Sequence, residues 1–277
     1  MSGNHDTKNL PFVCGCHSTF PNFSPFLQIK SPCFTIWGAG LEIDGLGFAT
    51  PGTRLSFACR YCNKTYSKES TLIAHLCEPK RRHQQQNETG VQFGFKAYLR
   101  FYEITQGSAK LKTYDDFVAS PYYLAFVKYG RYLVSIRAVN VNSFTDWLLK
   151  NNKKLDYWCK DSLYEEWLFE YLKKENPQDA LERALREMQD YADTHPDLRN
   201  GFKDYFRYGN VNRVCHHIGT GRISPWVIFN CSSGVEFLDQ LTEDQVGLIL
   251  PAIDPDYWQR KFRDYPDDVA WCKNILN

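Results

Sequence analysis

Residues 59–77 of the chain read CRYCNKTYSKESTLIAHLC. Two residues separate Cys59 from Cys62, and twelve separate Cys62 from His75. A Cys-x2-Cys knuckle places two thiolates on one metal ion, and this interval allows a turn and a short helix that returns a histidine to it. The spacing predicts a small ββα-like unit that binds zinc through Cys59, Cys62 and His75.

The same stretch resembles a C2H2 zinc finger, since Tyr66 and Leu72 stand where such fingers carry an aromatic residue and a leucine. The resemblance implies that the side chains facing DNA bases would be Lys68, Ser70, Thr71 and Ala74. None of these is Arg, Asn or Gln, so the set reads bases poorly. A single finger also covers only about 3 base pairs. The resemblance therefore implies little sequence specificity.

The fourth ligand departs from the family pattern. A regular finger would place it at residues 79–81, which are Pro, Lys and Arg and cannot bind zinc. Cys77 and His83 remain as alternatives, and we favour Cys77 because thiolate binds zinc strongly and the loop to close is shorter. Pro79 disfavours helical geometry at Glu78, so we expect the finger helix to end near Cys77 and to turn its thiolate inward.

Charge is concentrated around the finger. Residues 54–112 carry 11 Lys and Arg against 4 Asp and Glu, a net charge of +7, whereas residues 113–277 carry a net charge of −5. We expect phosphate contacts from side chains that fan out beside the finger helix, and the predicted nucleic-acid-binding residues are Lys68, Lys80, Arg81 and Arg82. DNA is favoured over RNA, with a protein partner on the acidic domain. The alternative is a solvated linker whose finger acts as a folding staple or a protein-docking unit.

The pattern outside the finger predicts a mainly α protein in three parts. Residues 1–54 are rich in Pro, Phe, Gly, Asn and Ser and predict an irregular or partly disordered arm. Residues 55–88 form the finger with its basic extension, and residues 89–277 form an all-helical domain in which apolar residues recur at helical spacing.

Helix start signals recur in the helical domain. Capping-box spacing is found at Thr113 with Asp116, Ser143 with Asp146 and Thr242 with Gln245. A proline at a first helical position is indicated at Pro121, Pro177 and Pro255. Residues 212–227 have the layout of a helix-turn-helix, but we favour an ordinary helical corner, because any two short helices joined tightly share this layout.

The other cysteines point to packing rather than chemistry. Apolar or aromatic neighbours predict buried, inert side chains for Cys159, Cys215, Cys231 and Cys272. In the arm, which also contains Cys33, the run of Cys14, Cys16 and His17 could bind a metal, but a second metal site is not favoured because a fourth ligand is not obvious.

Several function classes lack their signatures. The sequence has no run of 18 apolar residues for a membrane span, and its first residues do not read as a signal peptide. It has no P-loop, G-x-G-x-x-G, H-E-x-x-H or G-x-S-x-G motif. We therefore expect a non-enzymatic, cytoplasmic protein.

Three segments, residues 94–103, 125–132 and 221–226, look like an uncharacterised protein family of T4-like phages, notably those of marine cyanobacteria. A fainter similarity, in residues 123–136 and near 223–224, is to the helicase loader of T4-type phages. The resemblance implies an accessory protein of phage replication or transcription that acts in the host cytoplasm. The alternative is a structural or morphogenetic phage protein with a structural zinc site.

Overall fold

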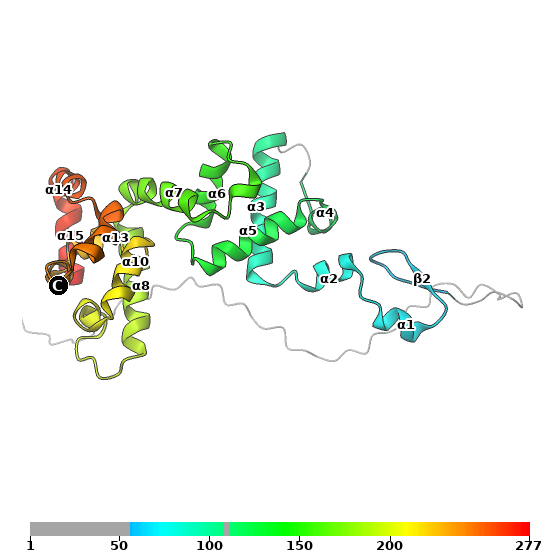
Figure 1. Cartoon of the computed structure of the whole chain (residues 1–277), viewed down its shortest axis with the longest axis horizontal. Helices are drawn as coiled ribbons and strands as arrows, with labels where there is room; N and C mark the ends of the chain where they lie inside the picture. Colours follow the sequence, from blue (N-terminus) through cyan, green and yellow to red (C-terminus); the bar gives the residue numbers. More distant parts are fainter. Residues whose placement is uncertain (1–55, 108–110) are drawn as a thin grey trace, which may run out of the picture. The chain divides into compact units, whose positions relative to one another are not determined.

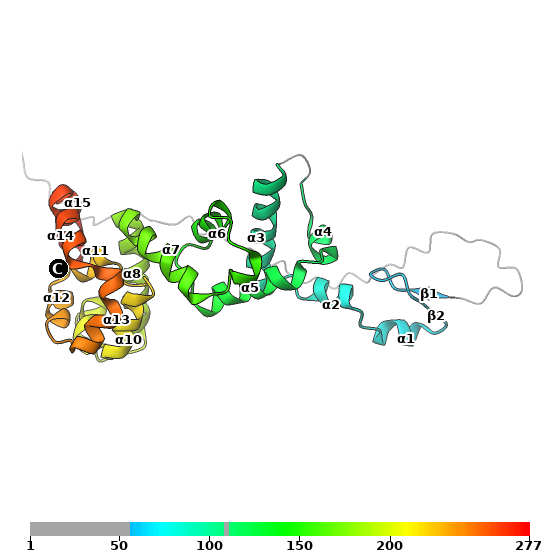
Figure 2. The same cartoon turned by 45° about the horizontal axis from the view of Figure 1, so that its top comes forward.

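The computed structural model describes residues 56–107 and 111–277, which belong to one unit of the chain, Arg54–Asn277. The predicted arm and its Cys14, Cys16, His17 and Cys33 lie outside the described residues. The described part is mainly α, as the sequence predicts, with one small two-stranded sheet (Figures 1 and 2).

The finger begins with a short hairpin. Strand β1 (Phe57–Ala58) pairs antiparallel with β2 (Thr65–Tyr66), so that Phe57 lies opposite Tyr66. Helix α1 (Glu69–Ala74) follows and has no buried residue. The order ββα is the one that the ligand spacing predicts.

The segment after α1 differs from the prediction. The helix ends at Ala74, and His75 has an extended backbone. Cys77, also extended, is the N-cap residue of a second helix, α2 (Glu78–Gln84). The expectation that Pro79 ends the finger helix near Cys77 is wrong, because Pro79 lies in the first turn of α2, where its missing N–H costs no helical hydrogen bond.

The helical domain continues to the C-terminus of the chain. Its α-helices are α3 (Thr89–Gln106), α4 (Tyr114–Ala119), α5 (Tyr123–Ser135), α6 (Val141–Lys150), α7 (Asp161–Lys174), α8 (Pro177–Asp193), α9 (Tyr205–Tyr208), α10 (Val211–Gly219), α11 (Pro225–Ile228), α12 (Ser232–Leu238), α13 (Glu243–Ile253), α14 (Pro255–Asp264) and α15 (Pro266–Leu276). Two 3₁₀ turns, Leu155–Tyr157 and Gly201–Asp204, interrupt the series.

Helices α3 and α5 cross at three glycines. A Cβ atom added at Gly130 would lie 1.9 Å from the carbonyl oxygen of Gly90, and one added at Gly94 would lie 2.5 Å from that of Phe126. The absence of side chains therefore lets the two backbones touch. Aromatic rings pack around this crossing, with Tyr98 and Phe126 at a centroid distance of 5.6 Å.

Most local helix signals are confirmed. Thr113 and Thr242 form complete capping boxes, and Pro177 and Pro255 open α8 and α14. Two expectations are wrong. Ser143 is not a cap, because Asn140 caps α6 and accepts the N–H of Ser143. Pro121 lies in a turn before α5.

Burial confirms the helical corner that we favour for residues 212–227 and excludes the helix-turn-helix alternative. The predicted layout is present, since α10 is followed by Ser224 as the N-cap of α11. All four residues of α11 are buried, however, whereas a recognition helix must expose its side chains to a DNA groove. Residues 211–228 therefore form a helical corner of the core.

Four cysteines of the helical domain are predicted to be buried and inert. Cys215, Cys231 and Cys272 are buried, and Cys159 is partly buried.

Across the part of the chain that the structure describes, no helix is both long and apolar enough to span a bilayer.

Candidate metal centre

The Cys59–Cys62 knuckle is shaped by its own backbone. The N–H of Cys59 donates to the carbonyl of Lys64 at 2.9 Å, and the N–H of Asn63 donates to the carbonyl of Cys59 at 2.8 Å. Asn63 adopts the left-handed conformation, with φ of 58°, which lets the chain reverse between β1 and β2. The reversal directs the Cys59 and Cys62 thiols to one side.

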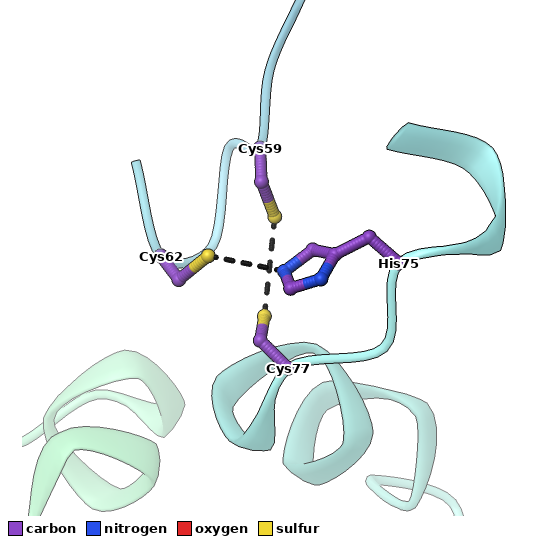
Figure 3. A group of neighbouring side chains, drawn as sticks. All are labelled: Cys59, Cys62, His75 and Cys77. Atoms are coloured by element: carbon purple, nitrogen blue, oxygen red, sulfur yellow. Dashed lines mark hydrogen bonds between the residues drawn. The ribbon is translucent and has the colours of Figure 1, made fainter. Parts of the chain in front are cut away.

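Four side chains meet at this point (Figure 3). The ligand atoms of Cys59, Cys62, His75 and Cys77 all lie within 4.8 Å of one another. Cys62 Sγ is 3.2 Å from His75 Nε2, and Cys59 Sγ is 3.9 Å from Cys77 Sγ. The pairs come from the knuckle and from the extended link between α1 and α2.

The cluster fits a tetrahedral metal ion. Metal–sulfur bonds of about 2.3 Å and a metal–nitrogen bond of about 2.0 Å give edges of about 3.8 Å between sulfurs and about 3.5 Å between sulfur and nitrogen. The Cys59–Cys77 edge matches the first value, and the Cys62–His75 edge is slightly shorter than the second. The four residues could therefore hold one metal ion.

The backbone of the knuckle also changes the pKa values of the Cys59 and Cys62 thiols. Burial disfavours the Cys59 thiolate, but hydrogen bonds from the backbone N–H groups of Tyr61 and Cys62 outweigh it and hold the pKa of Cys59 below its ordinary value. At Cys62 a backbone hydrogen bond from Lys64 favours the thiolate, yet burial and the neighbouring thiols raise the pKa. The neighbouring thiols therefore favour the Cys59 thiolate and oppose ionisation of Cys62, and a bound cation would favour the ionised form of both.

His75 is fixed from two sides. Its ring lies 5.0 Å from the ring of Tyr66, the aromatic residue of β2. Its carbonyl accepts a hydrogen bond from Lys80 Nζ at 2.9 Å, and the same amine reaches the carbonyl of Ile73 at 3.4 Å. Lys80 thereby ties the end of α1 to α2 and positions the ligand segment. The sequence did not reveal this role.

His83, the alternative fourth ligand, lies outside the cluster. It is on α2, where its ring is 5.1 Å from that of Tyr61 and its Nε2 is 3.4 Å from a carboxylate oxygen of Asp115. Cys77 is therefore the residue that the structure brings to the other three.

The residues predicted to bind nucleic acid are placed differently from one another. Lys68 is exposed, as are the other three positions of the expected base-facing set, Ser70, Thr71 and Ala74. Arg81 is 53% exposed and pairs with Glu78 at 2.5 Å. The amine of Lys80 donates to the carbonyls of Ile73 and His75. We expect Lys80, Arg81 and Arg82 to fan out beside the finger helix after its end; the structure instead places them on a second helix, α2.

Arg82 turns towards the helical domain. Only 18% of its side chain is exposed, and its guanidinium donates to the carbonyl of Val118 at 2.6 Å and lies 4.4 Å from the ring centre of Tyr123. Tyr114 donates its hydroxyl to the Arg82 carbonyl at 2.9 Å. These contacts join α2 to α4 and α5, so Arg82 acts in packing.

Two apolar side chains on the finger were not singled out from the sequence. Ile73 is 71% exposed and Leu76 is 61% exposed. Leu72, their neighbour, is partly buried against the finger. The apolar residues within 72–76 could have predicted this exposure, because so short a helix can turn only one large apolar side chain, that of Leu72, towards the cysteines.

Comparison with known proteins adds no relative, since no protein-family model, curated protein or solved structure matches this chain.

Proposed function

We propose that residues 56–85 form a zinc finger whose metal is structural. The observation that carries this proposal is the convergence of three thiols and one imidazole within 4.8 Å. Sulfur-rich tetrahedral sites are typical of Zn²⁺. Cys59, Cys62, His75 and Cys77 would supply all four ligands, which leaves no position for a water or a substrate. We therefore propose that this metal centre has no catalytic role.

The surface of the finger supports nucleic acid as its partner. Arg60, Lys64 and Lys68 are exposed on the knuckle, the hairpin and the start of α1. Within the described residues none of the three forms an ion pair. Cations left without carboxylate partners suit phosphates, and the small side chains of the base-facing positions suit binding with little sequence preference.

This proposal agrees with the phage resemblance. An accessory protein of phage replication or transcription needs to hold DNA without a fixed site, and it would act in the host cytoplasm. DNA is the proposed partner in preference to RNA, and the acidic helical domain is the proposed surface for a protein partner.

The test is salt-dependent binding of the zinc-loaded full chain to a labelled DNA duplex. The triple variant Arg60→Ala/Lys64→Ala/Lys68→Ala should weaken binding equally across sequences and lower the slope of log affinity against log salt by up to about 3. The matched control removes three exposed cations of the helical domain, Lys128→Ala/Lys154→Ala/Arg199→Ala. Equal loss in both variants, or no binding of wild type at low salt, would refute the nucleic-acid proposal.

A second candidate is a structural or morphogenetic role, in which the finger docks on protein. The exposed Ile73 and Leu76 favour it, since apolar side chains gathered at one end of a small unit mark contact surfaces. If wild type binds neither DNA nor RNA, light scattering of wild type and of Ile73→Ser/Leu76→Ser decides whether this surface mediates self-assembly.

A further inference from the structure

A groove of about 700 Å³ lies between the end of α7 and the helix α14. Four cationic residues and two tyrosines line it with a single carboxylate: Lys173, Lys174, Arg260, Lys261, Tyr257, Tyr265 and Asp264. The surrounding segment, residues 113–277, is acidic overall. The positive charge of the groove is therefore a local arrangement and not a consequence of composition.

The lining of the groove holds four cations against one carboxylate, Asp264. Across the described part of the chain, no close ion pair involves any of the four cations, although the carboxylates of Glu175 and Asp268 act on Lys261 from nearby. Lys174 and Arg260 are exposed, and Arg260 Nε donates only to the backbone carbonyl of Asp256, at 3.1 Å. The groove therefore keeps an excess of positive charge, and an anion that enters it gains favourable Coulomb energy.

Lys261 is held at the back of the groove. Its amine donates to the carbonyl of Lys173, which also accepts the hydroxyl of Tyr257 at 3.1 Å. The amine lies 5.2 Å and 5.4 Å from the ring centres of Trp258 and Trp226. Partial burial lowers the pKa of Lys261, although Glu175 and Asp268 act in the opposite direction. This ammonium is fixed in place, so it can bind a ligand with little loss of side-chain entropy.

Flat aromatic surface accompanies the charge. Tyr265 is 51% exposed, and Tyr257 is partly exposed, with the amine of Lys173 4.9 Å from its ring centre. Lys174 also lines a neighbouring groove between α6 and α7, where Trp147 and Tyr171 contribute rings. Cations that alternate with aromatic rings along a groove are the chemistry that binds single-stranded nucleic acid, through phosphates and stacked bases.

We infer that this groove binds single-stranded nucleic acid. Lys174, Arg260 and Lys261 contact the phosphates, and Tyr257 and Tyr265 stack on bases. The inference deepens the proposed function, on which it rests for the class of ligand, and assigns it a second contact in the helical domain. The finger would bind duplex, and the groove would bind single strands.

The experiment measures binding of the zinc-loaded full chain to a fluorescein-labelled oligothymidylate. Lys174→Gln/Arg260→Gln should lower affinity at least tenfold and reduce the salt slope by about 1.4, near 0.7 for each phosphate contact to a single strand. Tyr265→Ala should lower affinity about tenfold with an unchanged salt slope, because stacking involves no counterion release. The matched control, Lys128→Gln/Lys154→Gln, should bind as wild type does.

Three results would overturn the inference. The first is Lys174→Gln/Arg260→Gln binding the oligonucleotide as the control does. The second is thymidine monophosphate or inorganic phosphate competing as well as the oligonucleotide, which would make the groove a site for small phosphates. The third is a DNA duplex bound in the groove as tightly as the single strand. Arg60→Ala/Lys64→Ala/Lys68→Ala separates the two proposals, since it should impair duplex binding while leaving oligothymidylate binding intact.

Discussion

The finger and the helical domain are stabilised by opposite means. In residues 56–85 only Cys59 is buried, and neither α1 nor α2 contains a buried residue. The helical domain buries aromatic side chains throughout, including Phe126, Tyr129, Trp158 and Trp226. A unit as small as the finger cannot bury enough apolar surface to fold alone, so in our proposal metal ligation takes the place of a core.

The largest expected effect concerns the finger. Cys62→Ser should abolish zinc binding and unfold residues 56–77, because the free energy of zinc binding, about 10–16 kcal/mol at pH 7 in finger peptides, is also the folding free energy. The far-UV circular dichroism and the melting transition of the helical domain should remain. Amide hydrogen exchange located by mass spectrometry measures both parts in one experiment. Collapse of protection throughout α3 and α5 would show that the two parts are not independent.

The second prediction tests the helical core. Phe126 is fully buried and its ring meets those of Tyr98, Phe101 and Trp158. Phe126→Ala should lower the free energy of unfolding by about 3–5 kcal/mol and leave zinc content unchanged. The control is Tyr122→Ala, since this neighbouring side chain is exposed, and it should change stability by no more than about 0.5 kcal/mol. Loss of zinc in Phe126→Ala would show that the finger depends on the helical core for its stability.

The third prediction concerns acid. Burial, assisted by the nearby charges of Arg222 and Arg213, lowers the pKa of His217 to about 4, and its Nδ1 meets the Tyr205 hydroxyl at 2.8 Å. In the unfolded chain His217 takes up a proton near pH 6.5, whereas in the folded chain it stays neutral down to about pH 4. The free energy of unfolding should therefore fall between about pH 6.5 and 4, by about 3 kcal/mol.

Urea unfolding of chelator-treated protein at several pH values checks this, since zinc release then contributes nothing. His217→Gln, which cannot titrate, should show a flatter profile than wild type over the same range. Identical pH profiles for the two proteins would exclude His217 as the acid-sensitive group.

The sequence predicted what depends on local spacing. The spacing of the knuckle and the length of the turn predict that Cys59, Cys62 and His75 come together, as they do, and residues three apart predict the caps of α4 and α13. Cys77 was chosen for its short loop, but the supporting reason was wrong, because the backbone leaves the helix at His75 and not near Cys77. An extended link turns the thiol inward more simply than an opened helical turn.

What the sequence could not give depends on contacts between distant segments. Ser143 fits a capping box as well as Thr113 does, and only the choice of Asn140 as the cap excludes it. The position of Arg82 in a basic cluster predicts a phosphate contact, but its guanidinium donates to the carbonyl of Val118, 36 residues further along the chain. The groove between α7 and α14 is lined by residues far apart in the chain, so no local sequence pattern predicts it.

The central claim is that Cys59, Cys62, His75 and Cys77 form one zinc centre, and competition with a zinc chelator, read by native mass spectrometry, tests it most directly. Wild type and His83→Ala should each carry one zinc per chain with affinities within about twofold, because His83 lies outside the cluster. Cys77→Ser should weaken zinc binding by at least about tenfold, since it removes a ligand. Wild type that takes up no zinc, or zinc lost in His83→Ala and retained in Cys77→Ser, would contradict the account.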